Sequence, residues 1–221
     1  MNKEKRNWCL MAIFLYLPFF IEFFAYPLFQ KIQPEWLGIA LFMIIYTYLF
    51  YGAAIVVYHK WSKRTDEPVT WKLKHPKAKT VIIALLVGIV FRRLEFFMFG
   101  ESQTPMLITE FIGYTKNAPV LWMGIIGYLL QEIYYIFEFT LAACIVDCAQ
   151  KAFEKFGWSR RIPWGGLFLG LTWGLGHIIT KNDVATGVWC LLLSLVIGSV
   201  YTYLKRTPTT AWLTIAAAYL L

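Results

Sequence analysis

Three ionisable side chains inside apolar stretches carry the chemistry that this sequence offers. Glu132 and Glu138 lie in the apolar stretch from Val120 to Gln150, and His177 lies in the next apolar run. A carboxylate inside an apolar helix costs a few kcal/mol or more in lipid, so such residues usually face a bundle interior or a cavity. Because a buried acid beside an imidazole can activate water, we treat these three residues as candidate catalytic groups.

Depth and helical phase favour different carboxylates as the partner of His177. At a rise of about 1.5 Å per residue, Glu132 lies roughly 15 to 20 Å below the outer end of its helix, and His177 roughly 6 to 10 Å below the end of its own. Glu138 lies about 9 Å deeper than Glu132, so depth favours Glu132. Phase complicates this choice, because Gln131 and Glu138 share a helix face and Glu132 points about 100° away from Gln131. Both carboxylates therefore remain candidate bases.

Five further residues near these three are candidates for supporting or substrate-binding roles. They are Gln131, Tyr134, Tyr135, Arg92 and Trp173. Each type of residue also has a structural explanation. Arg92 can pair with Glu95 three residues later, and tyrosines can pack with their hydroxyls bonded. A protonated Glu132 or Glu138 can bond a neighbouring helix, and His177 can serve helix packing, where glycines at small-xxx-small spacing indicate close approach.

Composition and the length of the apolar runs are typical of a membrane protein. The chain has 221 residues, of which 59% are hydrophobic and 19% aromatic. Its apolar runs are about 20 residues long, which is the length that a helix needs to cross a hydrocarbon core of about 30 Å. We predict an all-α fold, a polytopic membrane helical bundle forming a single domain over 1–221. The first run is too long for a signal peptide, so we expect a retained span.

The positions of basic residues predict how the chain crosses the membrane. About seven spans are expected, at 8–30, 36–58, 80–99, 119–146, 164–180, 184–204 and 208–221. With a cytoplasmic N-terminus, the inner segments hold 16 Lys and Arg and the outer loops hold 3; the inner segments are 1–7, 59–79, 147–163 and 205–207. Such an excess is typical of cytoplasmic loops. The last span has only 14 residues, so we expect it to be tilted, re-entrant or incomplete.

Several other classes of protein and site are not favoured. The net charge of +8 comes from short loops, where it fits lipid headgroups rather than nucleic acid. His59 and His75 fall in the basic linker and are read as ordinary loop residues. No CxxC pair occurs among the four cysteines, and no HExxH motif occurs, so we expect no disulfide framework, metal or cofactor. Neither paired half-helices nor an inverted repeat indicates a transporter.

The order of the polar motifs resembles that of a known family. Gln131 and Glu132 lie in one span, Trp173 and His177 end the next, and a glycine-containing segment then leads into a short last helix. This order, within 119–221, resembles the CPBP group of intramembrane endopeptidases, the CAAX-protease and bacteriocin-processing (Abi) proteins. Residues 8–118 would then supply the N-terminal spans. The resemblance implies a multi-pass membrane protein in which a glutamate activates water, assisted by histidines and an asparagine. The small size and compact loops fit a bacterial cytoplasmic membrane.

The sequence departs from the motifs of that family at four positions. Gln131 stands where the first glutamate of the Glu-Glu-x-x-x-Arg motif is expected, and Ile136 where the arginine is expected. Trp173 replaces the phenylalanine of Phe-x-x-x-His. The last helix has neither His nor Asn, and Ala217 falls at the histidine position. Because glutamine has no ionisable carboxylate, hydrolysis would need another acid, with His177 as oxyanion donor or second base.

Two functions from different classes follow. The first is a CPBP-type endopeptidase in which Glu132 or Glu138 activates water to cleave a membrane-associated peptide or protein. The second is a catalytically inactive CPBP-like protein that binds a peptide or protein partner, in an immunity or accessory role. In both, the lipid bilayer surrounds the chain. The first predicts loss of function when the acid becomes an amide, and the second predicts that function is retained.

Overall fold

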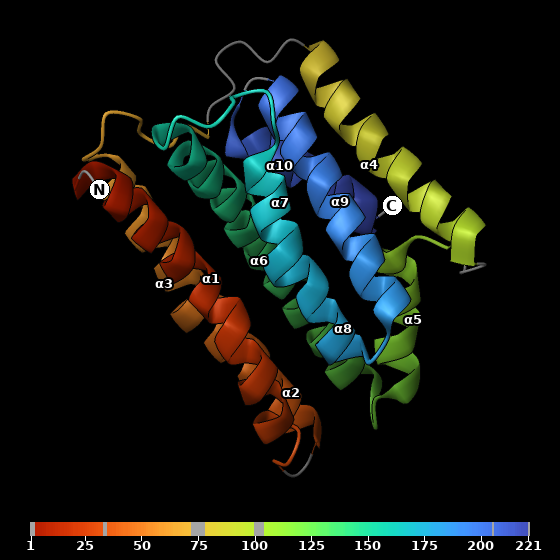
Figure 1. Ribbon diagram of the computed structural model, residues 1–221. Helices are drawn as coiled ribbons and strands as arrows, with labels where there is room; N and C mark the ends of the chain where they lie inside the picture. The colour runs from red at the N-terminus through yellow and green to blue at the C-terminus, as the bar shows by residue number, and fades with distance from the viewer. Residues whose placement is uncertain (1–2, 33–34, 72–77, 100–103, 205, 221) are drawn as a thin grey trace.

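The computed structural model describes residues 3–32, 35–71, 78–99, 104–204 and 206–220. These residues form eight continuous helices and contain no strand (Figure 1). The predicted all-α fold is confirmed for these residues. In chain order the helical segments are α1 (Lys3–Phe29), α2 (Glu35–Ile44), η1 (Ile45–Gly52), α3 (Ala53–Ser62), α4 (Ala78–Phe99), α5 (Met106–Asn117), α6 (Leu121–Lys155), α7 (Trp164–Leu169), η2 (Gly170–Gly174), α8 (Leu175–Lys181), α9 (Val184–Tyr203) and α10 (Pro208–Leu220). The segments η1 and η2 are π-helical and each continues the α-helices on either side.

Four of these helices are long and apolar enough to cross a membrane. They cover Glu4–Phe29, Trp36–Ser62, Leu121–Lys155 and Val184–Tyr203. Large apolar side chains such as Leu28 and Leu49 are mostly exposed on them. Such a surface would be unfavourable in water and suits contact with lipid. These four helices therefore indicate a multi-pass membrane protein.

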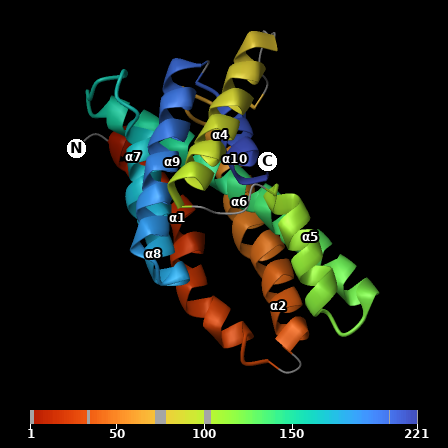
Figure 2. The ribbon, with the colours of Figure 1, turned by 90° about the vertical axis from the view of Figure 1, so that its right-hand side faces the viewer.

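Helix α6 is the centre of the bundle. Its 35 residues span about 52 Å, which is longer than a hydrocarbon core of about 30 Å. It packs against α1, α5, α7, α10 and η1, and these neighbours surround it in Figure 1 and Figure 2. Every residue from 141 to 150 is buried. The polar side chains within this stretch, Asp147 and Gln150, therefore face protein rather than lipid.

Glycines allow α7 and α9 to approach each other closely. A Cβ atom added at Gly166 would lie 2.5 Å from the carbonyl oxygen of Ser194 and 2.8 Å from Cα of Gly198. Only residues without a side chain fit at this crossing, so the close helix approach predicted from the small-xxx-small spacing is confirmed at Gly166.

Ion pairs gather the four basic segments at one end of the bundle. The ammonium of Lys155 lies 2.7 Å from Oε1 of Glu4 and 2.5 Å from Oδ2 of Asp66, and Arg206 pairs with Glu154. The hydrogen bond from Lys155 lowers the pKa of the Asp66 carboxyl below its usual value. The N-terminus and the three other segments predicted to be cytoplasmic thus lie on the same side, as the alternation of spans requires.

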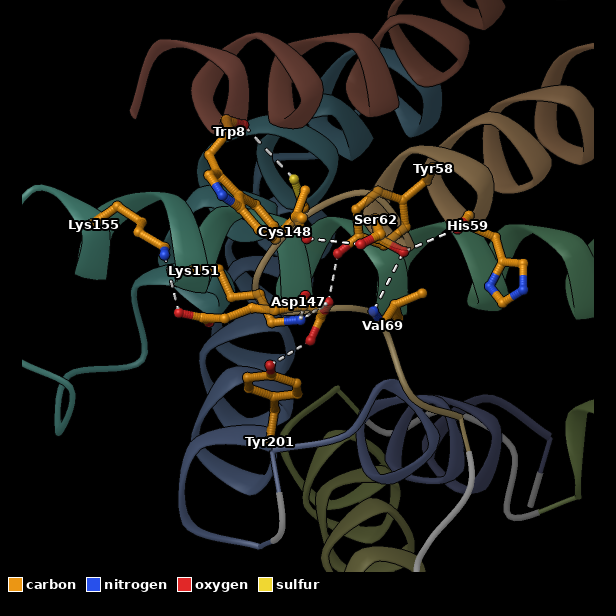
Figure 3. A network of polar contacts seen from close by, with 12 residues as sticks. Trp8, Tyr58, His59, Ser62, Val69, Asp147, Cys148, Lys151, Lys155 and Tyr201 are labelled. Carbon is orange, nitrogen blue, oxygen red and sulfur yellow. Dashed lines mark hydrogen bonds and ion pairs between the residues drawn. The ribbon is translucent and has the colours of Figure 1, made fainter. Parts of the chain in front are cut away.

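A buried aspartate ties three helices together near this end. Asp147 on α6 is 1% exposed and accepts hydrogen bonds from the hydroxyls of Tyr58 on α3 and Tyr201 on α9, each at 2.5 Å. The ammonium of Lys151 lies 2.9 Å from Oδ2. Figure 3 shows the three donors converging on the carboxylate from different helices. All of its charge is compensated inside the protein, so Asp147 acts as a structural junction.

Two connections were predicted incorrectly as loops. His59 was expected in the linker 59–79, but α3 continues to Ser62 and places His59 in its last turn. The linker begins later because Ser62 is buried and its hydroxyl bonds back to the carbonyl of His59. His75 lies outside the described residues. The stretch after the third expected span also contains a helix, α5, which sequence analysis did not identify.

We expect substitution of Asp147 by Asn to destabilise the bundle by about 3 to 5 kcal/mol, because the largely buried Lys151 ammonium loses its counter-charge. Replacing Tyr58 with Phe should cost less, about 1 to 3 kcal/mol, because only one donor is lost. The measurement is unfolding in mild detergent, followed by circular dichroism. Tyr203→Phe is the matched control, since that exposed hydroxyl bonds only a backbone carbonyl. Equal stability of Asp147→Asn and the control would contradict this role.

Candidate functional site

Glu138 lies at the centre of the candidate site. It is on α6, 8% exposed, and its Oε1 accepts a hydrogen bond of 2.9 Å from the indole Nε1 of Trp173. Trp173 is itself buried and belongs to η2, in the helix that continues to His177. The structure therefore joins the deeper of the two candidate acids to the helix that carries the candidate imidazole.

His177 is held by the same tryptophan. Its Nδ1 lies 2.9 Å from the backbone carbonyl oxygen of Trp173, and the two rings meet edge to face with centroids 4.6 Å apart. A carbonyl can only accept, so Nδ1 carries the proton and Nε2 of the neutral ring has a free lone pair. Neither Nε2 of His177 nor Oε2 of Glu138 bonds another described residue.

A third carboxylate, Glu22 on α1, belongs to this site and was not identified from the sequence. One of its oxygens accepts from the hydroxyl of Tyr51 on η1 and the other from the hydroxyl of Tyr134 on α6, and the two hydroxyls are 3.1 Å apart. Glu22 lies within electrostatic range of Glu138. The signal was present: Glu22 is a carboxylate within an apolar run, which is the criterion that singled out Glu138.

We call Glu22, Tyr51, Tyr134, Glu138, Trp173 and His177 the Glu138 cluster. Its side chains come from α1, η1, α6, η2 and α8. The two π-helical segments of the structure each supply one member, Tyr51 from η1 and Trp173 from η2. Single π-helical turns within α-helices occur often at functional sites, because the extra residue redirects side chains at a cost in helix stability. This coincidence supports a function for the cluster.

Glu132 belongs to a different group of side chains. It precedes Glu138 by six residues, which turns it about 120° away around α6. Its Oε1 is buried without a partner among the described residues, and its charge interacts with that of Glu110 on α5. Nothing in the described contacts links it to His177. Of the two candidate bases, Glu138 alone is joined to the imidazole through Trp173.

The other candidate residues of α6 lie either in the Glu138 cluster or against α5. Tyr134 belongs to the Glu138 cluster. Tyr135 donates a hydrogen bond of 2.5 Å to Glu110, and Gln131 accepts one of 3.0 Å from Tyr114, both on α5. These bonds attach α5 to the first half of α6.

Arg92 pairs with Glu95 on its own helix. The guanidinium Nη1 lies 2.6 Å from Oε2 of the carboxylate, at the i, i+3 spacing that sequence analysis considered. In the described residues, no group of three or more His, Cys, Asp and Glu side chains is arranged to hold a metal ion.

Comparison with known proteins adds no assignment. No family model, no curated protein and no solved structure matches the chain.

We expect neutral His177 to carry its proton on Nδ1, because its partner is the carbonyl of Trp173. The ¹⁵N chemical shifts of selectively labelled histidine would report this tautomer in lipid, with His177→Gln used to assign the signals. The expected spectrum has a protonated Nδ1 and an unprotonated Nε2 for this ring. A proton on Nε2 in the neutral ring would contradict the described hydrogen bond.

Proposed function

We propose that the protein is a CPBP-type intramembrane endopeptidase that cleaves a peptide bond of a membrane-associated substrate, with Glu138 as the group that activates water. The observation that carries the proposal is the tryptophan bridge: Trp173 bonds Glu138 through its indole and His177 through its carbonyl. One rigid residue thus orients both an acid and an imidazole, which leaves one oxygen and one nitrogen unbonded.

In the proposed hydrolysis, Glu138 moves one proton from the attacking water to the leaving amine. Oε2 of Glu138 takes a proton from a water molecule, and the resulting hydroxide adds to the substrate carbonyl carbon. The tetrahedral intermediate then breaks its C–N bond as Glu138 returns the proton to the leaving amine. Nε2 of His177 accepts the second hydrogen of the attacking water and orients it. A neutral ring protonated on Nδ1 cannot donate from Nε2, so this role suits His177 better than oxyanion donation.

The tryptophan bridge indicates which residue of this chain corresponds to the water-activating glutamate of the family. In the simplest alignment, Gln131 occupies the position of the water-activating glutamate. Glu138 lies on the same helix face, two turns later, and meets the Phe-x-x-x-His-like segment through Trp173. We therefore assign to Glu138, rather than Glu132, the role that the family gives its first glutamate.

The proposal includes seven spans and a cytoplasmic N-terminus in a bacterial membrane. Helices α4 and α10 pack along each other, and a Cβ added at Gly88 would be 2.5 Å from the carbonyl oxygen of Thr214, so the two form a close pair beside the long apolar helices. The shared ionic end of the bundle and the excess of basic residues there support this orientation.

A second candidate is a CPBP-like protein without catalysis that binds a peptide or protein partner. The observation that favours it is the composition of α10. Where the family carries a histidine that helps position water or substrate, this chain has Ala217, a buried residue packed toward α4. A site that lacks this group can retain the architecture and bind without cleaving.

Substitution of Glu138 by Gln distinguishes the two candidates. The amide oxygen can still accept from Trp173, so the fold should persist, but no base remains. For the endopeptidase we expect at least a 100-fold slower release of cleaved peptides, because general-base catalysis contributes roughly that factor or more. The measurement compares peptide termini in membranes of cells producing each variant, by quantitative mass spectrometry.

Glu67→Gln is the control, since it removes a carboxylate at the ionic end without touching the cluster. Its peptide termini should match those of the unaltered protein, and unfolding temperatures should verify that Glu138→Gln is folded. If no terminus depends on the unaltered chain, or if a folded Glu138→Gln produces the same termini, the hydrolytic proposal is wrong and the binding function is favoured.

A further inference from the structure

A cavity of about 700 Å³ lies between α2, α5 and the first half of α6. Its volume is within the range of small-molecule sites, which are commonly about 300 to 1,000 Å³. The walls are largely apolar and aromatic, with Trp36, Met43, Trp122 and Leu130 among them. No member of the Glu138 cluster lines it, so the cavity is a separate feature of the protein.

One carboxylate, Glu110 on α5, lines this cavity. Its Oε1 accepts a hydrogen bond of 2.5 Å from Tyr135, whereas its Oε2 is buried and has no partner among the described residues. Glu132 beside it also has a buried oxygen without a partner. A buried acceptor without a donor is costly, so a ligand that brings a donor to Oε2 would remove this cost.

The charges in and around the cavity favour a cation as the hydrogen-bond donor to Oε2 of Glu110. None of the residues that line it is Lys or Arg. Among the described basic residues, Lys181 on α8 lies within electrostatic range of Glu110, but it is exposed and forms no described ion pair with it. Trp36, Tyr114 and Trp122 in the walls can add cation–π attraction.

We infer that this cavity binds a single-chain amphiphile with a primary or secondary ammonium head. The ammonium donates to Oε2 of Glu110, and the alkyl chain occupies the apolar part of the cavity. Oε2 of Glu110 requires a hydrogen-bond donor, and the absence of Lys and Arg from the lining favours a donor that carries positive charge. A zwitterionic phospholipid fits less well, since no cation lines the cavity to receive its phosphate.

The test uses the full chain in phosphatidylglycerol nanodiscs, titrated calorimetrically with octylammonium, octyltrimethylammonium and octanol, after subtraction of binding to empty discs. We expect saturable binding of octylammonium, at least tenfold weaker binding of octyltrimethylammonium, which has no N–H, and at least tenfold weaker binding of octanol. Equal affinities for octylammonium and either other probe would overturn the assignment of the head group.

Two variants test separately the negative charge of Glu110 and the volume of the cavity. Glu110→Gln keeps an acceptor for Tyr135, so it should fold and bind octylammonium at least tenfold more weakly. Gly113→Leu places a side chain where nothing lies within 4 Å of an added Cβ, so it should fill the cavity without strain and abolish saturable binding. Glu67→Gln, at the opposite end, should bind as the unaltered chain does. Unchanged affinity in a folded Glu110→Gln or Gly113→Leu would overturn the inference.

A final comparison distinguishes a free amphiphile from a lipid headgroup. In discs containing phosphatidylethanolamine, whose headgroup also carries a primary ammonium, we expect the affinity for octylammonium to stay within a factor of two. A tenfold loss would mean that the phospholipid itself occupies the cavity, which contradicts the single-chain assignment.

Discussion

The structure depends on one constraint: a polar group inside a bilayer must find its partner within the protein, since lipid provides none. Helix α6 carries three of the buried polar side chains of the described residues, Glu138, Asp147 and Gln150, and other helices pack around it. Near the ionic end, Asp147 receives two tyrosine hydroxyls and an ammonium. In the middle, Glu138 receives the indole of Trp173. The helices that supply partners to Asp147 and Glu138 are therefore held against α6.

The turn of α6 separates two polar sites that are near in sequence. One face presents Glu138 to α1, η2 and α8, where the acid shares Trp173 with His177. Another face presents Glu132 to α5, beside the cavity that Glu110 lines. The first site holds a buried acid and an imidazole, to which we assign water activation, and the second has an apolar volume with an acceptor that has no partner among the described residues. Under the two proposals, a single helix supports a reaction at one site and ligand binding at the other.

The sequence predicted features that follow from local composition and from long apolar runs. The all-α fold, the long apolar helices and the grouping of basic segments at one end all follow from hydropathy and charge, because each residue contributes to them independently. The choice between Glu132 and Glu138 could not be made, because it depends on which helices pack on which face of α6. Glu22 could have been identified from its place in an apolar run, but its partners could not, because Tyr134 follows it by 112 residues. Helix α5 was missed because it is short, and hydrogen bonds to α6 fix its position.

The most direct test of this account is an experimental structure of the protein in lipid nanodiscs, at a resolution that shows side chains and ordered water. We expect a distance near 2.9 Å between the indole Nε1 of Trp173 and Oε1 of Glu138, with Nδ1 of His177 at the carbonyl of Trp173. We also expect a water molecule between Oε2 of Glu138 and Nε2 of His177. A Glu138 side chain that faces lipid, or a Trp173 indole bonded elsewhere, would contradict the central claim that one tryptophan joins the acid to the imidazole.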